Sequence, residues 1–338
     1  MDAARFQAIV SRYPNLRIAV IGDFCLDRYF EIDPARQEIS IETSLPVHNI
    51  TNVRCQPGGA GTILNNLSAL GIASIYPVGF YGDDGEGFEL QRALRARPGV
   101  NMDHFICTSE RRTFTYTKPL VMYSGKAPEE LSRLDIKNWA PTPDALQRKV
   151  IESAGAVMRK VDAAILLDQV DLAETGVVTR SLLQAFGKQR AGLILVDSRR
   201  GLRDFPPMVF KMNRAEFSRL TGAPKDLPLD RLKEAARALA TKNHQHVFIT
   251  LSEEGILGAS SSGDIAHVPA LPVRGEIDIV GAGDAVSANL TASLAAGATI
   301  LEAITLANAA ASIVIHQLGT TGTATVEQLK AICLDKTA

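Results

Sequence analysis

Four short apolar runs, separated by long stretches of helix-forming sequence, constrain the fold of this chain most strongly. They are LRIAVIGD at 16–23, AAILLD at 163–168, LILVD at 193–197 and HVFITL at 246–251. Runs this short and continuous are typical of strands buried on both faces, and helices between such strands make the sheet parallel. We therefore expect an α/β fold, a three-layer sandwich with a mainly parallel central sheet.

Two further segments have a different pattern and predict a second, smaller sheet. The stretch EISIETSLPVHNITNVR, within residues 29–56, alternates apolar and polar side chains and lacks helical spacing. Such alternation is typical of strands with one covered face. An irregular segment at about 110–135 contains RRTFTYTKPLVMYSG and is a candidate to join these strands. We expect a small sheet that projects from the core.

The composition excludes several classes of protein. Of 338 residues, 46% are hydrophobic and 22% are charged, which provides enough apolar sequence for one large packed domain. The formal net charge is -1, so no overall field favours nucleic acid or an anionic membrane surface. The four cysteines form no C-x-x-C pair, which argues against a zinc knuckle or a disulfide framework. With no long apolar window either, we expect a cytoplasmic protein that binds neither nucleic acid nor membranes.

A glycine turn before an alanine-rich stretch is the strongest candidate for chemistry. In DIVGAGDAVSANL at 278–290, Gly281, Ala282 and Gly283 precede Asp284 at the point where a buried helix should begin. Backbone N–H groups in the first turn of a helix lack partners, so this turn is suited to hold a phosphate. The alternative interpretation makes Asp284 a favourable first-turn acid, worth about 0.3–1 kcal/mol. No G-x-x-x-x-G-K-[ST] loop is present, and the Gly281-x-Gly283 pair lacks the third glycine of a dinucleotide fingerprint.

Four elements together resemble the ribokinase (PfkB) family of carbohydrate kinases. DIVGAGD at 278–284 is similar to the family signature D-T-x-G-A-G-D, with Ile279 in place of threonine. The other elements are IGDFCLD at 21–27, CQPGGAGTILNNLSALG at 55–71 and KMNRAEF at 211–217, and all four occur in the family's order. The resemblance implies a single ribokinase-like domain over residues 1–338, with a β lid formed by about 29–56 and 110–135.

Within this family, the sequence most resembles the D-glycero-D-manno-heptose 7-phosphate kinases. The likeness is carried by GDFCLDRYF at 22–30, QPGGAG at 56–61, SRLDIKN at 132–138 and ANAAASIVIHQLGT at 307–320. The segment 119–131 departs from the branch pattern, and Thr62 stands where the branch has a sugar-contacting asparagine. A hydroxyl cannot reproduce the paired contacts of an amide. We therefore expect heptose 7-phosphate to be a poorer substrate than some other sugar or sugar phosphate.

The resemblance implies ATP-dependent transfer of a phosphoryl group to a hydroxyl of a sugar or sugar phosphate. Asp284 would accept the hydroxyl proton, and the N–H groups of Gly281, Ala282 and Gly283 would hold the transferring phosphate. Alternative functions are a ribokinase-like or nucleoside kinase, and a non-catalytic nucleotide or sugar sensor on the same fold.

The implied cofactors are ATP and Mg²⁺, and a monovalent cation is a further candidate. Asn213 and Glu216 would organise the Mg²⁺ and the phosphates, largely through water. Their alternative role is a capping asparagine with a first-turn acid. The nucleotide is expected between TLSEEGIL at 250–257 and the ANAAAS helix at 307–312. The residues predicted to bind it are Thr250, Ser252, Gly255 and Asn308, together with Asn213 and Glu216.

On the sugar side, the resemblance implies a site where the first strand ends and the second glycine motif begins. Asp27 would bind a hydroxyl, whereas Asp23 is either a sugar ligand or a structural turn residue. The predicted substrate residues are Asp23, Asp27, Gly58, Gly59, Thr62 and Asn66. Cationic residues in or near the lid would pair with a second phosphate or are simply solvated; they are Arg111, Arg112, Lys118 and Arg133. The resemblance also implies a homodimer formed through lid strands.

Overall fold

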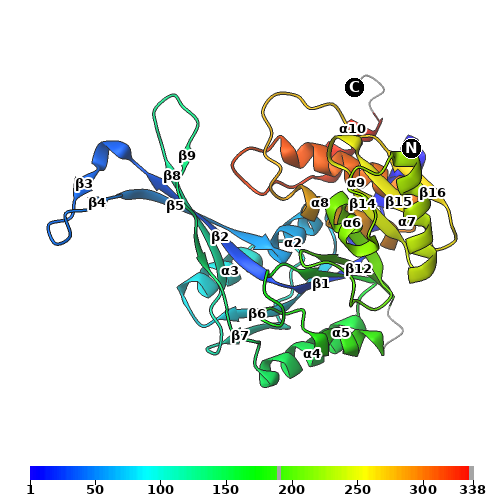
Figure 1. Cartoon of the computed structure of the whole chain (residues 1–338), viewed down its shortest axis with the longest axis horizontal. Coiled ribbons are helices and arrows are strands. Elements are labelled where there is room, and N and C mark those ends of the chain that lie inside the picture. Colours follow the sequence, from blue (N-terminus) through cyan, green and yellow to red (C-terminus); the bar gives the residue numbers. More distant parts are fainter. Residues whose placement is uncertain (189–191, 335–338) are drawn as a thin grey trace.

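The computed structural model describes residues 1–188 and 192–334, and a nine-stranded sheet forms its centre (Figure 1). The strand order is β16-β15-β14-β13-β12-β11-β1-β6-β7, and every pair from β14 to β7 is parallel. An antiparallel hairpin, β15 and β16, completes one edge. The strands are β1 (Arg17–Gly22), β6 (Ser74–Gly82), β7 (Phe105–Thr108), β11 (Ala163–Asp168), β12 (Leu193–Ser198), β13 (Val209–Asn213), β14 (Val247–Thr250), β15 (Ile256–Ala259) and β16 (Ile265–Val268). Each of the four predicted apolar runs contains a strand of this sheet, which confirms the mainly parallel α/β core.

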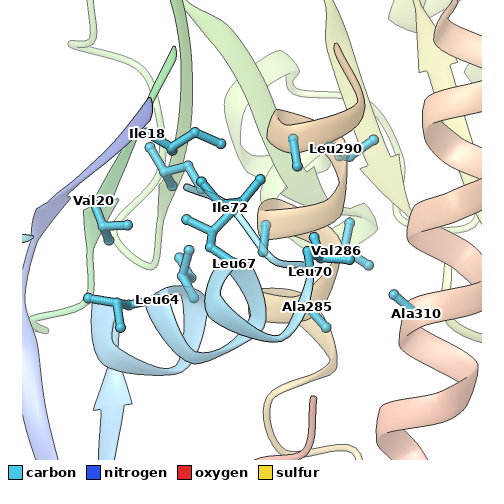
Figure 2. Packing of buried hydrophobic residues seen from close by; sticks show 14 of the residues in the cluster. Ile18, Val20, Leu64, Leu67, Leu70, Ile72, Ala285, Val286, Leu290 and Ala310 are labelled. Atoms are coloured by element: carbon cyan, nitrogen blue, oxygen red, sulfur yellow. The ribbon is translucent and has the colours of Figure 1, made fainter. Parts of the chain in front are cut away.

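Helices cover both faces of the sheet, because successive side chains of each central strand point to opposite faces. In β1, Ile18 and Val20 belong to one buried cluster, whereas Ala19 and Ile21 belong to the other. Figure 2 shows the first cluster, in which α2 packs against β1 and α8 lies between α2 and α9. The first face carries α1 (Ala3–Val10), α2 (Ala60–Ala69), α3 (Gly85–Arg95), α8 (Ala282–Ala295), α9 (Ile300–Ile315) and α10 (Val326–Leu334). The second carries α4 (Asp144–Met158), α5 (Arg180–Gly187), α6 (Arg214–Thr221) and α7 (Leu229–Asn243).

A smaller sheet projects from this body, as Figure 1 shows at the left. Its strand order is β10-β8-β2-β5, with β9 paired to β8. β2 pairs antiparallel with β5 and parallel with β8, so the sheet is mixed. The strands are β2 (Phe24–Ile32), β5 (Ile50–Gly59), β8 (Phe114–Val121), β9 (Glu129–Glu130) and β10 (Leu134–Ile136), and a hairpin of β3 (Glu38–Ile39) and β4 (Pro46–Val47) extends it. β2 begins one residue after Asp23, which therefore lies at the junction of the two sheets.

Three short 3₁₀ helices complete the described secondary structure: η1 (Tyr13–Asn15), η2 (Pro34–Arg36) and η3 (Ser252–Glu254). Among the described residues, no helix has both the length and the apolar character required to cross a bilayer.

Candidate active site

The glycine turn starts helix α8 without any side chain that caps it. Gly281 is the N-cap residue and has φ 84° and ψ -7°, a left-handed conformation that favours glycine. A Cβ at this position would also lie 3.3 Å from Cβ of Thr321. Within the described residues no side chain accepts a hydrogen bond from the first-turn N–H groups. The Ala282 N–H donates to the Ile279 carbonyl at 3.2 Å. The helix end presents its remaining backbone donors and the positive end of its dipole to an anion.

Asp284 lies in the first turn of α8 but does not act as its cap. Its side chain is partly buried, and burial raises the pKa of Asp284 to about 7. The nearby ammonium of Lys211 opposes this rise in pKa, whereas the carboxylates of Asp197 and Asp27 add to it. The carboxyl group is therefore poised to gain or lose a proton near neutral pH.

Lys211 is the important site residue that sequence reasoning missed. It is 6% exposed in the middle of β13, and its Nζ lies 2.6 Å from Oδ2 of Asp197 on β12. A Cβ at Gly283 would lie 3.2 Å from the same Nζ, so the ammonium is beside the glycine turn. The sequence signal was a lone charge inside the apolar strand VFKMN. A buried lysine with a carboxylate partner supplies a fixed positive charge for a phosphate.

Asn213 and Glu216 form the capping box that was their alternative role. Asn213 Oδ1 accepts a hydrogen bond from the Glu216 N–H at 2.9 Å, and Glu216 Oε2 accepts one from the Asn213 N–H at 2.7 Å. Burial raises the pKa of Glu216, and charges on Asp197 and Lys211 also affect it. One oxygen of Glu216 thus remains for water or a cation. Within the described residues, no three His, Cys, Asp or Glu side chains converge to hold a metal directly.

On the small sheet, Asp27 lies close enough to Asp284 for its charge to raise the pKa of that residue. The region between Asp27 and the glycine turn is called the cleft below. Gly58 on β5 pairs with Cys25 on β2, two residues before Asp27. A Cβ on Gly58 would lie 2.5 Å from Oδ2 of Asp27, so the absence of a side chain at Gly58 leaves room for this carboxylate. Burial raises the pKa of Asp27 to about 6, while Lys118 and Arg133 lower it. Gly59 has φ 56° and is the N-cap residue of α2. The structure therefore brings Asp27 and the Gly58–Gly59 pair together with Asp284.

Three predicted substrate residues make contacts within the protein. Asp23 is 3% exposed, and its carboxylate accepts hydrogen bonds from the N–H groups of Gln169, Val170 and Val177, at 2.9, 3.3 and 2.7 Å. This is the structural role considered as an alternative. Asn66 is fully buried and donates to the carbonyl oxygens of Thr62 and Gly322.

Thr62 is buried under the glycine turn. A Cβ on Gly281 would lie 3.5 Å from its methyl group, and its hydroxyl donates to the Pro57 carbonyl at 3.4 Å. Its contact with the turn is therefore through the methyl group.

The predicted nucleotide residues lie at the turn between β14 and β15 and on α9. Thr250 ends β14, and Ser252 and Gly255 have φ values of 53° and 88° in the turn that follows. Asn308 donates to the Pro269 carbonyl at 2.9 Å, which ties α9 to the chain after β16. The β14–β15 turn and helix α9 flank the same end of the sheet as the glycine turn at residues 281–283. The side-chain amide of Asn308, however, already donates a hydrogen bond within the protein.

The cleft-facing side of the small sheet carries two cross-strand rows. The sequence named Asp27 and Lys118, but not the residues that align with them. The register aligns Gln56, Asp27, Tyr116 and Asp135 in one row, and Arg54, Tyr29 and Lys118 in the next. Arg54 and Lys118 lie over the Tyr29 ring, with the Arg54 Cζ and the Lys118 Nζ at 4.7 and 5.4 Å from its centroid. Arg133 lies over Tyr116 at 5.0 Å. The rows are two residues apart, about 7 Å along a strand.

Two of the four cationic residues predicted in or near the lid lie just before β8 and pair with groups outside the small sheet. Arg111 is buried and donates to the Pro141 carbonyl. Arg112 pairs with Asp84 and Glu86 at the start of α3. Lys118 and Arg133 belong to the cleft-facing side of the small sheet.

Comparison with known proteins identifies the class to which this fold and cleft belong. The sequence matches the pfkB family carbohydrate kinases over residues 16–327, and the chain belongs to this family. The bifunctional protein HldE of Azorhizobium caulinodans is 32% identical over 325 residues, covering 95% of this chain and 65% of that protein. HldE of Gluconobacter oxydans is 30% identical over 307 residues, covering 90% and 62%. The chain thus spans about two thirds of the length of these relatives.

Solved structures show the same fold. Phosphofructokinase-2 from Escherichia coli, in complex with substrates and products, superposes with a TM-score of 0.73 at 19% identity, covering 94% of this chain and 98% of that one. A putative sugar kinase from Clostridium perfringens gives 0.73 at 20% identity, covering 94% and 95%. Arabidopsis thaliana ribokinase, complexed with ribose and ATP, gives 0.64 at 18% identity, covering 93% and 97%. The predicted ribokinase-like sandwich with a small projecting sheet is confirmed, and the protein is a carbohydrate kinase.

Proposed function

We propose that this carbohydrate kinase transfers the γ-phosphoryl group of ATP to a hydroxyl of a sugar that already carries an anionic group, with Asp284 as general base. The observation that carries the proposal is a carboxyl group with a pKa of about 7 beside an uncapped helix start. A base with this pKa is substantially deprotonated at neutral pH and still basic enough to take a proton from a reacting hydroxyl.

In the proposed reaction, the acceptor oxygen forms a bond to the γ-phosphorus while the bond from that phosphorus to the β-phosphate oxygen breaks. The hydroxyl proton goes to Asp284, and ADP leaves with the electron pair of the broken bond. The N–H groups of Gly281 and Gly283 and the Lys211 ammonium stabilise the negative charge on the transferring group, and the Ala282 N–H would join them by leaving the Ile279 carbonyl. The Lys211 contact with Asp197 fixes the position of that ammonium.

Mg²⁺ would be held by the nucleotide phosphates and, through water, by Asn213 and Glu216. Hard oxygen donors suit this cation, and Glu216 has one oxygen outside the capping box. The bound cation would neutralise charge on the phosphates. A monovalent cation is also part of the proposal, supported by a structural neighbour described in complex with potassium. Turnover with potassium and with a bulky ammonium salt as the alternative cation tests it.

The acceptor's own anionic group is proposed from the two rows on the small sheet. Asp27 and Gln56 offer polar groups for sugar hydroxyls near the glycine turn, and the cationic row lies about 7 Å farther out. Arg54 pairs with Glu31 at 2.6 Å and Arg133 pairs with Asp135 at 2.7 Å. No carboxylate lies within ion-pair distance of Lys118 among the described residues. Lys118 is therefore the cation most available for a phosphate on the sugar.

The small sheet is proposed to act as a lid and to pair between two copies of the chain. Its outer hairpin exposes large apolar side chains at Ile39, Ile41 and Leu45, with 59%, 100% and 64% of their surface accessible. Apolar side chains gathered on a projecting element indicate a contact surface.

An ADP-release screen with matched pairs of sugars and sugar phosphates, plus nucleosides, tests the proposed activity. We expect turnover with ATP and magnesium, preference for the phosphorylated member of a pair, and loss of turnover in Asp284→Asn. The phosphorylated carbon is then identified by nuclear magnetic resonance. Preference for nucleosides would contradict the acceptor class, and ATP binding without ADP release from any acceptor would favour a sensor.

A further inference from the structure

A cavity of about 780 Å³ lies away from the glycine turn, between helix α5 and the loop that follows β12. Asp168, at the end of β11, is part of its lining, whereas Asp284, Asp27 and Lys211 are not. The volume falls within the range of about 300–1,000 Å³ that is usual for small-molecule sites. The cavity is therefore large enough for a small ligand. Because its lining does not include Asp284, Asp27 or Lys211, this ligand would be distinct from ATP and the sugar.

Three arginines line this cavity: Arg180 at the start of α5, and Arg200 and Arg203 in the loop that follows β12. Two of the three acids in the lining already have partners. The fully buried Asp168 accepts hydrogen bonds from the Ser198 hydroxyl at 2.6 Å and from Arg200 at 2.9 Å.

The second acid is Glu174, which accepts from the backbone N–H of Arg180 at 3.0 Å. Within the described residues, the guanidinium groups of Arg180 and Arg203 have no acceptor, and Asp204 is the acid that remains. The lining thus offers more free positive than negative groups, in the planar geometry that suits carboxylates and phosphates.

Two loops separate the cavity from the cleft, and each contributes to both. In loop 169–177, Glu174 lines the cavity, whereas Asp171 pairs with Lys137 at 3.0 Å and with Arg199 at 3.6 Å on the cleft side. In loop 199–206, Arg200 lines the cavity and Arg199 reaches the cleft, where its charge affects the pKa of Asp284.

Backbone geometry makes loop 169–177 a candidate for movement between two arrangements. Glu174 has φ 65°, an unfavourable conformation for a residue with a side chain. Asp23 fixes both ends of the loop through Gln169 and Val177. A ligand that replaces the Glu174 contact with the Arg180 N–H would therefore act on the loop three residues from Asp171.

We propose that this cavity binds a small molecule bearing several carboxylate or phosphate groups. Binding there changes the position of Arg199 in the cleft through the Asp171–Arg199 pair. Binding requires the arginines of the lining. Transmission requires that the ligand favour one arrangement of the two loops, because a ligand changes an equilibrium only by its difference in affinity. Any effect of this ligand on sugar binding in the cleft rests on the proposed function. Binding of the ligand to the cavity and the response of the loop do not.

Binding is tested by calorimetric titration with citrate and with inorganic phosphate, in the absence of nucleotide, sugar and magnesium. We expect saturable binding of at least one probe, weakened at least tenfold in Arg203→Ala and in Arg180→Ala. Arg231→Ala is the control, because this exposed arginine of α7 pairs with Glu234 away from the cavity. Preference for citrate or phosphate distinguishes the two ligand chemistries. Absence of saturation by both probes, or equal affinity in all variants, overturns the proposal.

The loop response is tested with intrinsic fluorescence, since Trp139 is the single tryptophan of the chain. Trp139 is 74% exposed and lines a small cavity with Asp171 and Leu172 of loop 169–177. We expect the bound probe to change the Trp139 emission in the wild-type protein and in Arg231→Ala, but not in Arg203→Ala. Unchanged Trp139 emission at saturation would overturn the proposed response of loop 169–177 to binding. Neither measurement uses ATP or a sugar, so its failure is distinct from failure of the proposed kinase reaction.

Discussion

Three aspartates around the cleft have raised pKa values through burial, yet their hydrogen bonds give them different roles. The pKa of Asp23 is about 6, and three backbone N–H groups hold its carboxylate in place. Asp27 has a similar pKa, but it faces two cations across the small sheet. Asp284, with a pKa of about 7, lies beside the uncapped turn and the Lys211 ammonium. Among the three, Asp284 has both a pKa near neutrality and a position beside backbone donors and an ammonium that can hold a reacting phosphate.

Asp284→Asn is expected to lower kcat by roughly 100-fold or more, because an amide cannot accept the hydroxyl proton as a base. Binding of ATP and of the acceptor should change little, since the shape of the turn is preserved. Steady-state kinetics combined with equilibrium titrations separates the two effects. Near-wild-type turnover in this variant would remove Asp284 from the proposed role.

The same substitution should stabilise the fold. The folded-state pKa of Asp284 is about 7, above its ordinary value of 3.8, so folding favours the protonated form. That stabilisation is present below pH 4 and is lost as the pH rises through about 7. Asparagine mimics the protonated form at every pH, so the Tm advantage of Asp284→Asn should grow between pH 4 and pH 7 and then level off. Thermal melts check this, with Asp230→Asn on exposed α7 as the control; a pH-independent advantage would contradict it.

Among the elements, the junction of β12, β13 and α8 determines the charge around the turn. The Lys211 ammonium of β13 lowers the pKa of Asp284, and the Asp197 carboxylate of β12 raises it. Lys211→Met should therefore move the acid limb of the kcat/KM profile above its wild-type midpoint, in addition to lowering kcat. Lys149→Met, on the exposed face of α4, is the matched control. An unmoved midpoint in Lys211→Met would show that this lysine does not act on the base.

Lys118, on strand β8 of the small sheet, is proposed to bind a phosphate of the acceptor. Lys118→Met should raise KM for a phosphorylated acceptor by roughly 10- to 100-fold, the range of a lost charge-assisted hydrogen bond. The unphosphorylated partner sugar should show less than a twofold change, and Lys118→Arg should restore most of the affinity. An equal loss for both acceptors would indicate that Lys118 supports the sheet and does not bind the phosphate.

The sequence predicted elements better than it predicted contacts between them. Continuous apolar runs identified the buried strands because burial on both faces requires apolar side chains along the whole strand. The glycine turn was also predictable, because two glycines directly precede a long stretch rich in alanine and leucine. Lys118 was named as a candidate cation, but Lys211 and the alignment of Lys118 with Tyr29 and Arg54 were missed for a physical reason. Which residues become neighbours across strands depends on the pairing register, and the sequence of one strand does not contain it.

For the whole molecule, the projecting hairpin leads to a prediction about assembly. If the proposed lid pairing holds, the protein should be a dimer at micromolar concentration, because the exposed side chains of Ile39, Ile41 and Leu45 would be covered. Ile41→Glu should shift the mass toward the monomer, since a charge would then enter an apolar contact. Sedimentation velocity provides the measurement, with Leu301→Glu as a control, because Leu301 of α9 is 52% exposed. A monomeric wild-type protein across the accessible concentration range would contradict the proposal.

Cys25 lies at the base of the small sheet, is 3% exposed, and contacts the place where a Gly58 Cβ would be. Burial also raises the pKa of its thiol, so little of the reactive thiolate forms. Cys107, by contrast, is exposed. A thiol reagent should therefore label Cys107 quickly and Cys25 slowly. If the small sheet moves as the proposed lid, the ratio of the two labelling rates would report that motion without any introduced probe.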